Sequence, residues 1–198
     1  DLHCYLCSLP RLFTPDLSSI PGAPYLVAPP ERAEKIAALL APARDRLKVG
    51  IVWSGSTTFG KNHRRAQRLA TFLQAFALPG VRLFSLQKGL PAKELRSLPQ
   101  GGPVIDLAPH LDDFADTAAA VAQLDLVIMT DSAVAHLAGA LGKPVWVLLG
   151  HNAHWLWLRD RGDSPWYPSL RLFRPRAQGD WSHVFDAASD ALMELAGG

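Results

Sequence analysis

The chain has 198 residues, of which 48% are hydrophobic and 19% charged, a composition typical of a soluble globular protein with one good core. Its formal net charge of +2 gives no electrostatic reason to expect nucleic acid or an anionic membrane as a partner. No apolar run approaches the roughly 20 residues of a membrane-spanning helix, and no signal peptide is recognisable. We therefore expect a cytoplasmic protein.

The first part of the chain is rich in proline, and residues 1–30 contain six of the 16 prolines. Because proline fixes φ and lacks a backbone donor, this stretch is expected to be an extended, docked linker. A helix is expected over Glu31–Leu40, so residues 1–47 are interpreted as an interdomain linker and helix and residues 48–198 as the domain proper. The chain begins with Asp1 and not methionine, which favours a fragment of a longer protein.

His3, Cys4 and Cys7 lie close together in this first segment, and two cysteines so placed cannot form a disulfide framework. Zinc needs four ligands, and this group supplies three within a proline-rich linker. We therefore expect no metal site.

From Lys48 onward, short apolar runs typical of strands alternate with helical patterns. The later runs are almost continuously apolar, as in a parallel sheet covered on both faces. The expected strands are Val49–Trp53, Val81–Leu86, Val104–Leu107, Leu124–Thr130, Val145–Leu149 and Leu170–Phe173. This alternation predicts an α/β fold with a Rossmann-like, doubly wound parallel sheet.

The crossing helices are predicted from apolar residues at helical spacing. One helix is expected near Leu69–Phe76, a short one near Ala92–Leu98, and another after a cap at Asp112 or Asp113. The residues expected to face inward from the last three helices are Phe114, Thr117, Ala118 and Val121; Val134, Leu137, Ala138 and Leu141; and Trp181, Val184, Phe185, Ala188, Leu192 and Leu195.

The most informative stretch is 124–149, in which a buried strand ends at Asp131 and Ser132 and a small-residue helix follows. His136 lies four residues after Ser132, so both are expected on one side of that helix. The free N–H groups of the first turn favour a phosphate. Ala133, Gly139 and Ala140 are small enough to admit a ligand or another backbone. The alternative is a capped core helix with a satisfied histidine.

Two further loops follow strands at the same edge of the predicted sheet. After the first strand, Ser54 and Gly55 begin a hydroxyl- and glycine-rich turn, and Lys61, Arg64 and Arg65 come after it. These cations could neutralise a diphosphate, or they could form a solvated basic loop. After the second strand, Gln87 and Lys88 could contact a phosphate or a base, or simply end the strand in water.

An aromatic segment, His151–Tyr167, follows the fifth predicted strand. Its rings could stack on a ligand, or they could pack beneath a loop, which is the commoner arrangement. The rings concerned are Trp155, Trp157, Trp166 and Tyr167.

Several of these motifs resemble a known family. The stretch 126–149 resembles the D-T-x-x-x-H-L-A-x-A-L-G-x-P segment of family 9 glycosyltransferases, which include the heptosyltransferases. Other motifs are similar to bacterial proteins that join tetratricopeptide repeats to a glycosyltransferase domain. These motifs stand at Val49–Gly55, Ser85–Gly89, Asp113–Ala119, Asp163–Pro168 and Gly179–Trp181.

The resemblance implies the C-terminal, donor-binding half of a GT-B fold, with residues 48–198 as the nucleotide-sugar-binding domain. It places Ser54 and Gly55 at the diphosphate, Gln87 and Lys88 near the nucleotide or leaving phosphate, and Asp131, Ser132, Ala133 and His136 around the sugar and phosphates.

The reaction implied is an inverting transfer that needs no cofactor and no obligatory metal, because helix-end amides and cations stabilise the departing nucleoside diphosphate. The expected partners are a nucleotide-sugar and the N-terminal GT-B domain, which would supply the general base, with tetratricopeptide repeats as a further candidate. No catalytic residue is expected within this chain, so the chain alone is expected to be inactive.

The sequence departs from the family pattern at His154 and Leu156, where an aspartate and an arginine are usual, and Ser132 stands where threonine is commoner. Two alternatives therefore remain: a non-catalytic protein-interaction module, and an epimerase or hydrolase that acts on nucleotide-sugars.

Overall fold

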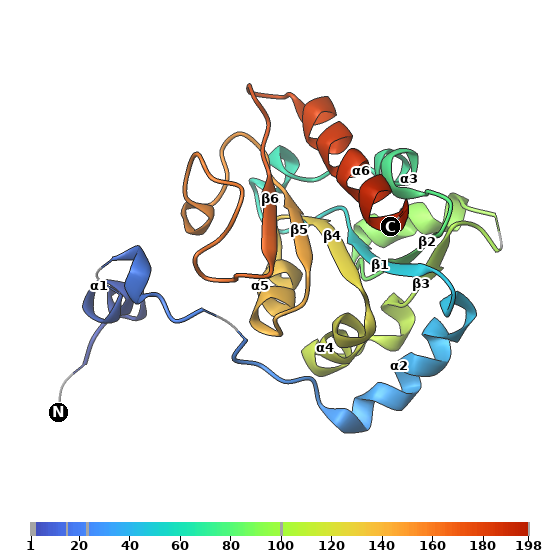
Figure 1. Ribbon diagram of the computed structural model, residues 1–198, viewed down its shortest axis with the longest axis horizontal. Helices are drawn as coiled ribbons and strands as arrows, with labels where there is room; N and C mark the ends of the chain where they lie inside the picture. Colours follow the sequence, from blue (N-terminus) through green and yellow to red (C-terminus); the bar gives the residue numbers. More distant parts are fainter. Residues whose placement is uncertain (1–2, 15, 23, 100, 198) are drawn as a thin grey trace.

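A computed structural model describes residues 3–14, 16–22, 24–99 and 101–197; within these ranges, the side chain of Cys7 lies outside the description. Six parallel strands form one sheet in the order β3-β2-β1-β4-β5-β6 (Figure 1). They are β1 (Leu47–Val52), β2 (Val81–Ser85), β3 (Val104–Asp106), β4 (Leu126–Thr130), β5 (Val145–Leu148) and β6 (Leu170–Phe173). This order is that of the doubly wound nucleotide-binding folds, so the predicted fold class is confirmed.

All six predicted strands form, and their ends differ from the prediction by a few residues at most. At the start of β4, the Asp125 carboxylate accepts the N–H of Lys48 at 2.8 Å, which aligns β4 beside β1. Gly50 lets Leu124 pack against β1, because a Cβ there would lie 2.7 Å from Leu124 Cδ1.

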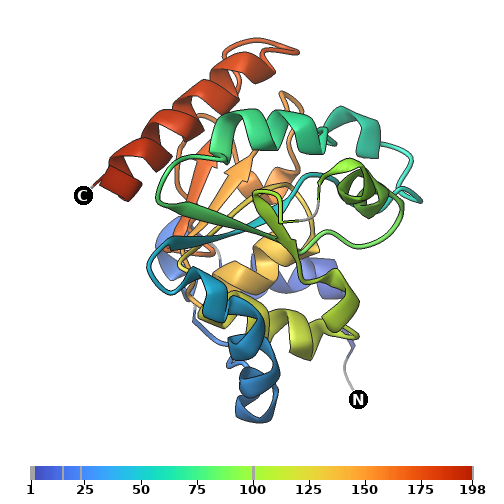
Figure 2. The same cartoon turned by 90° about the vertical axis from the view of Figure 1, so that its right-hand side faces the viewer.

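Helices cover both faces of the sheet, as Figure 2 shows. One face is covered by α3 (Leu69–Phe76) and α6 (Trp181–Gly197), whose buried side chains pack on Ile51, Leu83 and Ile128. Phe72, Phe76 and Phe185 form an aromatic cluster with ring centroids 5.5–5.8 Å apart. Burial on both faces explains the near-continuous apolar character of the strands.

The other face is covered by α2 (Ala33–Leu40), α4 (Phe114–Gln123) and α5 (Ala133–Ala140). Between α2 and α4, Arg32 Nη1 lies 2.8 Å from Asp116 Oδ1. The N–H of Asp112 and then the Arg32 guanidinium hold the pKa of the Asp116 carboxyl below its usual value. Asp113 caps α4 by accepting the N–H of Asp116, as predicted.

Four predictions about helices are wrong in whole or in part. Phe114, the first residue of α4, is 61% exposed because it lines an open cavity, and Leu195, near the end of α6, is 50% exposed. In α5 the prediction is partly right, because Ala138 is buried and Val134 and Leu141 are half-buried and pack against the core. The prediction missed the other buried residues, Ala135, Gly139 and Ala140. In place of a short α-helix at 92–98, a 3-10 helix spans Leu90–Ser97, with Pro91 in its first turn.

Other short 3-10 segments lie at Leu6–Ser8, Leu17–Ser19, Pro30–Arg32, Ala41–Ala43, Asn62–Arg64, Ala108–His110 and Trp155–Trp157.

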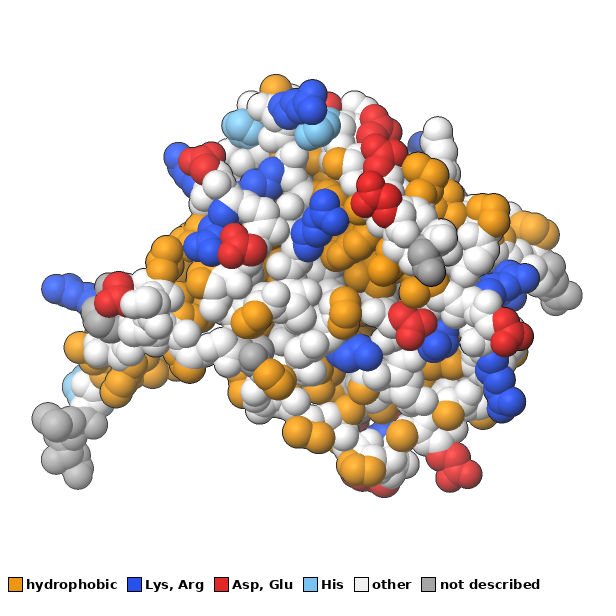
Figure 3. Space-filling view, viewed as in Figure 1, with side chains coloured by type: hydrophobic (Ala, Val, Ile, Leu, Met, Phe, Trp, Pro, Cys, Tyr) orange, Lys and Arg blue, Asp and Glu red, His pale blue; other side chains and the backbone are white. Residues whose placement is uncertain are grey.

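The N-terminal segment leaves the domain and carries the short helix α1 (Leu9–Phe13) at the left of Figure 1. Its later residues dock on the domain, since the N–H groups of Tyr25 and Leu26 donate to Ala140 O at 2.9 and 3.0 Å. Figure 3 shows hydrophobic side chains at the surface of this segment, where Tyr5, Leu6 and Phe13 are exposed. Among the described helices, none has both the length and the apolar character needed to cross a bilayer.

Candidate functional site

The predicted site residues follow β1, β2 and β4 and therefore lie at the carboxyl edge of the sheet. The chain order reverses between β1 and β4, so this edge contains the topological switch point at which α/β sheets bind ligands. Two cavities at this edge hold most of the predicted residues.

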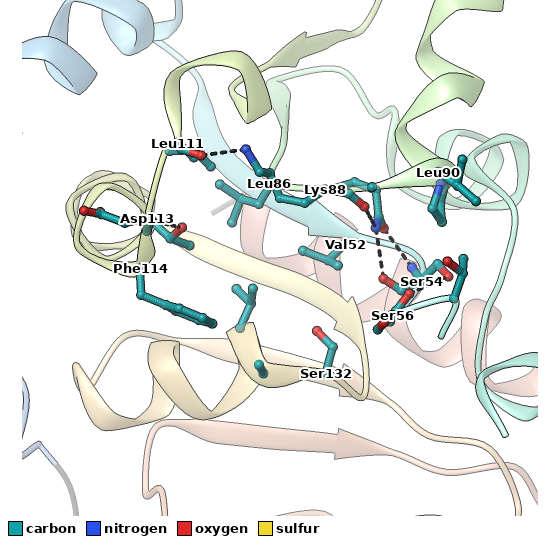
Figure 4. A pocket seen from close by; sticks show the side chains of 18 of the residues that line it. Val52, Ser54, Ser56, Leu86, Lys88, Leu90, Leu111, Asp113, Phe114 and Ser132 are labelled. Atoms are coloured by element: carbon teal, nitrogen blue, oxygen red, sulfur yellow. Dashed lines mark hydrogen bonds between the residues drawn. The ribbon is translucent and has the colours of Figure 1, made fainter. Parts of the chain in front are cut away.

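The first cavity, of about 430 Å³, lies between the ends of β1 and β2 and the first turns of α4 and α5 (Figure 4). Its walls are largely apolar, with Val52, Leu86, Leu111 and Phe114 among them. The residues predicted from sequence that line it are Ser54, Gly55, Gln87, Lys88, Ser132 and Ala133. Loops from three separate strands thus meet where the parallel topology predicts.

Gln87 holds the loop after β1 and is only 2% exposed. Its Oε1 accepts the N–H groups of Trp53 and Ser54 at 3.1 and 2.9 Å. Its Nε2 donates to Ser54 O at 3.0 Å and to Lys88 O at 2.9 Å. Both oxygen lone pairs and both amide hydrogens are therefore used within the protein, so Gln87 shapes the loop and has no free polar group for a ligand.

Lys88 extends from the end of β2 toward the loop before α4. Its Nζ donates to Ala108 O at 2.9 Å and to Leu111 O at 2.6 Å, and Figure 4 shows the bond to Leu111. The ammonium group thus binds carbonyls of the Ala108–His110 turn and its neighbour at the rim of the cavity.

Asn62 is a residue that sequence reasoning missed. Its Nδ2 donates to Ser54 Oγ at 3.0 Å, and its Oδ1 accepts from Arg65 Nε at 3.4 Å. A Cβ on Gly55 would lie 2.8 Å from Asn62 Oδ1 and 2.9 Å from Arg65 Nη2, so a larger residue there would have to displace these two side chains. Asn62 was hidden because one polar residue in a polar loop carries no pattern.

A second cavity, of about 310 Å³, adjoins the Asp131 side of the edge and is lined by Lys61, Arg64, Arg65, Asp131 and His154, among others. Asp131 is 7% exposed and does not cap α5; its Oδ2 lies 3.4 Å from Arg65 Nη1. Arg65 also lies over the Phe59 ring, 4.9 Å from its centroid. Lys61 and Arg64 are exposed, and within the described ranges neither forms an ion pair.

Ser132 and Ala133 open α5 beside the first cavity. Ser132 is the N-cap residue with extended backbone (φ −157°, ψ 176°), yet its side chain makes no capping bond. In Figure 4 its hydroxyl faces the open space. The first turn of α5 therefore presents N–H groups and the positive end of the helix dipole to this edge.

His136 lies apart from both cavities. Its ring is stacked on Trp157, with centroids 4.9 Å apart and planes at 8°, and its Nδ1 lies 3.2 Å from Tyr167 Oη. Burial lowers the pKa of the His136 imidazole below its ordinary value. The charge of Asp131 acts in the opposite direction and raises this pKa, whereas His154 lowers it further. These contacts correspond to the alternative of a satisfied histidine in a packed helix.

The space beside Gly139 is filled by Tyr167, whose Cγ would lie 2.5 Å from a Cβ at that position. The small residue therefore serves ring packing, and the expected room for a ligand is not present there. In the aromatic segment, Trp157 and Tyr167 are buried and Trp155 is 63% exposed. Trp157 and Tyr167 therefore pack in the core beneath the loop, as in the commoner of the two arrangements considered for this segment.

No metal site is formed by the described side chains, among which no three His, Cys, Asp or Glu residues are grouped so as to hold an ion. The group of His3, Cys4 and Cys7 falls partly outside this statement, because the Cys7 side chain is not described.

Comparison with known proteins gives consistent results. Residues 32–174 match glycosyltransferase family 9 (heptosyltransferase). A curated relative, Protein FlbA of Caulobacter vibrioides, is 32% identical over 160 residues, which are 75% of this chain and 25% of FlbA. The chain therefore spans a quarter of that relative.

Two solved structures share the fold. A family 9 glycosyl transferase from Veillonella parvula superposes with a TM-score of 0.62 at 12% identity, covering 86% of this chain and 52% of that one. The ADP-heptose LPS heptosyltransferase II of E. coli gives a TM-score of 0.61 at 15% identity, covering 90% and 57%. With a family match over most of its length, the chain belongs to glycosyltransferase family 9.

Proposed function

We propose that the chain is the donor-binding domain of a glycosyltransferase and binds a nucleoside diphosphate sugar. The observation that carries the proposal is the convergence of the loops after β1, β2 and β4 on one largely apolar cavity at the switch point. A basic cavity lies beside it, past Asp131. This combination suits a ligand with a flat, uncharged ring at one end and phosphates next to it.

In this proposal the nucleoside enters the first cavity between Val52, Leu86 and Phe114. The diphosphate lies along the first turn of α5 and the Gly55–Thr57 loop, where backbone N–H groups and the helix dipole stabilise negative charge. Lys61 and Arg64, which have no carboxylate partner in the described part of the chain, supply the balancing charge. Such a site would stabilise the leaving diphosphate without a metal.

Asp131 lies where the sugar would follow the phosphates, and Arg65 fixes the direction of its carboxylate. A carboxylate so held can accept hydrogen bonds from sugar hydroxyls. His136 acts through Trp157 and Tyr167 as support for α5 in this arrangement. The general base for an inverting transfer would come from a second domain that binds the acceptor.

The identity of the nucleotide is tested with adenosine, uridine and guanosine diphosphates. Calorimetric titration should show binding of one of them, with a matching rise in Tm. Ala133→Leu, which places a larger side chain at the mouth of the first cavity, should weaken binding about tenfold or more by steric exclusion. Ala177→Leu, in an exposed loop, is the matched control and should leave binding unchanged.

A second candidate function, protein interaction, is favoured by the exposed hydrophobic side chains of the N-terminal segment, such as Tyr5, Leu6 and Phe13. Failure of every nucleotide to bind, together with normal folding, would reject the donor-binding proposal and leave this second candidate.

A further inference from the structure

A third cavity, of about 430 Å³, lies at the ends of β5 and β6, beyond the loops after β1, β2 and β4 on which the proposed nucleotide site is built. It contains Arg159, Arg174 and Arg176. It shares Gly150, Asn152 and Ala153 with the second cavity, so the two lie side by side along the carboxyl edge.

The charge of this cavity is unbalanced. Asp160 is the one carboxylate among its lining residues, against three guanidinium groups. Within the described ranges, neither Arg159 nor Arg176 lies within ion-pair distance of a carboxylate. The whole chain carries a net charge of only +2, so this concentration of positive charge is local. A concave surface lined by one sign of charge attracts the opposite ion.

Hydrogen bonds fix the shape of this cavity, because Arg174 binds backbone carbonyls of the loop that forms its wall. Arg174 Nε donates to Arg161 O at 2.8 Å, and Nη2 donates to Trp157 O and to Leu158 O. That loop contains the described non-glycine residues with positive φ, Leu158 at 53° and Asp160 at 55°. Such backbone is strained and persists only where the surroundings impose it.

The three arginine side chains differ in how many N–H donors remain available to a ligand. Arg174 uses Nε and Nη2 on carbonyls, so its Nη1 remains for a ligand; Arg159 and Arg176 keep their whole guanidinium groups. A guanidinium donates in a planar fork that matches the two oxygens of a carboxylate or a phosphate.

We infer that this cavity binds a carboxylate or phosphate group carried by a sugar, at a position separate from the donor diphosphate. Its volume exceeds what a bare phosphate fills, and Asn152 and Asp160 supply acceptors and donors for hydroxyl groups. Continuity with the Asp131 side of the edge places the sugar ring toward the proposed transfer site. In that respect the inference rests on the proposed function.

The test uses the whole chain, labelled with ¹⁵N-arginine, and follows the arginine Nε–H signals by NMR. Glucuronate and glucose 6-phosphate are the probes for the two anion types, and glucose is the neutral comparison. The Arg159 and Arg176 signals should shift on adding one of the anionic sugars, and glucose should leave them unmoved. The arm that responds identifies a carboxylate or a phosphate as the group recognised.

Arg159→Ala/Arg176→Ala should weaken binding of the responding sugar about tenfold or more, because two charged donors are lost. The matched control is Arg44→Ala/Arg46→Ala, which removes the same charge from an exposed turn before β1 and should change nothing. Equal weakening in both double variants would show a nonspecific charge effect and overturn the inference. Unshifted arginine signals, or binding of inorganic phosphate without preference for the sugar, would also overturn it.

The two proposals fail separately. If the anionic sugars do not bind but a nucleoside diphosphate does, only the inference on this cavity is wrong. If the arginine cavity binds its sugar while no nucleotide binds, the donor-binding proposal is wrong and the cavity stands alone.

Discussion

The two halves of the sheet's carboxyl edge are built differently. On the β1–β2 side, polar side chains such as Gln87 and Lys88 are used up on the protein's own backbone, and the cavity walls are largely apolar. The cationic half comprises residues 61–64, at the far end of the loop after β1, together with the loops after β5 and β6. Its cations Arg64, Arg159 and Arg176 have no carboxylate partner in the described region. The first half suits an uncharged ring, and the second suits anions.

One half of the edge therefore provides a cavity of fixed shape, and the other half provides positive charge. Buried polar groups on the β1–β2 side fix the backbone of the loops, so the cavity is formed before a ligand arrives. On the other side the charged groups are exposed and can reorient. Asp131 and Ser132 lie at the boundary, at the end of β4.

The largest loss of stability is expected on the β1–β2 side, from removing the Gln87 side chain that holds the loop after β1. Gln87→Leu leaves the buried N–H groups of Trp53 and Ser54 without acceptors, which should cost about 3 kcal/mol of unfolding free energy. Urea denaturation measures this loss, and nucleotide binding should fall with it because the loop after β1 loses its shape.

Gln74→Ala, on the exposed side of α3, is the control and should be near neutral. If Gln87→Leu kept full stability while losing nucleotide affinity, Gln87 would be a direct ligand and the description of a saturated clamp would be wrong.

A smaller effect on stability is expected from pH, through His136 and the rings of Trp157 and Tyr167 against which it packs. Because burial lowers the pKa of His136 from its ordinary value of 6.5, the unfolded chain binds more protons in that range. The stability contributed by neutral His136 is therefore present above about pH 6.5 and is lost as pH falls through its lower folded pKa.

His136→Gln should flatten the stability profile between about pH 7 and pH 5, measured by urea denaturation at each pH. His63→Gln, in the exposed loop after β1, serves as comparison and should keep the slope of the parent. An unchanged slope in His136→Gln would mean that the histidine is not held neutral by its packing.

The smallest effect is predicted for Lys88. Since its ammonium group binds the carbonyls of Ala108 and Leu111, Lys88→Ala should lower stability by about 1 kcal/mol or less. Nucleotide affinity should change by less than about threefold. A loss of tenfold or more in calorimetric titration would show that Lys88 turns to the ligand, which would extend the cationic half across the edge.

Much of the fold could be predicted from sequence because buried parallel strands are continuous apolar runs, as at Leu126–Thr130, and the alternation with helices dictates a doubly wound sheet. That topology also predicts the meeting of Ser54, Gln87 and Ser132 at one edge. What a side chain does there depends on neighbours distant in sequence. The pairing of Arg65 with Asp131 and the reach of Gln87 to Ser54 leave no local pattern.

The cavity with Arg159, Arg174 and Arg176, and the packing of His136 on Trp157 and Tyr167, also depend on residues distant in sequence, so local patterns could not predict them. Arg159 and Arg174 come from different loops, and only the path of the 151–167 segment brings them together. Gly139 suggested an opening for a ligand, yet a ring from the same segment fills it. Phe114 has helical spacing with buried residues, but it lines the first cavity, and periodicity does not distinguish a cavity wall from the core.

The division into two halves is tested most directly by comparing a nucleoside with its diphosphate. In calorimetric titration of the nucleotide that binds, the diphosphate should bind about tenfold or more tightly than the nucleoside. Lys61→Ala/Arg64→Ala should reduce that advantage and leave nucleoside binding intact, because the N–H groups at the start of α5 remain in the variant. Equal affinities in the parent chain, or an advantage that is undiminished in the variant, would contradict the assignment of phosphate binding to the cationic half.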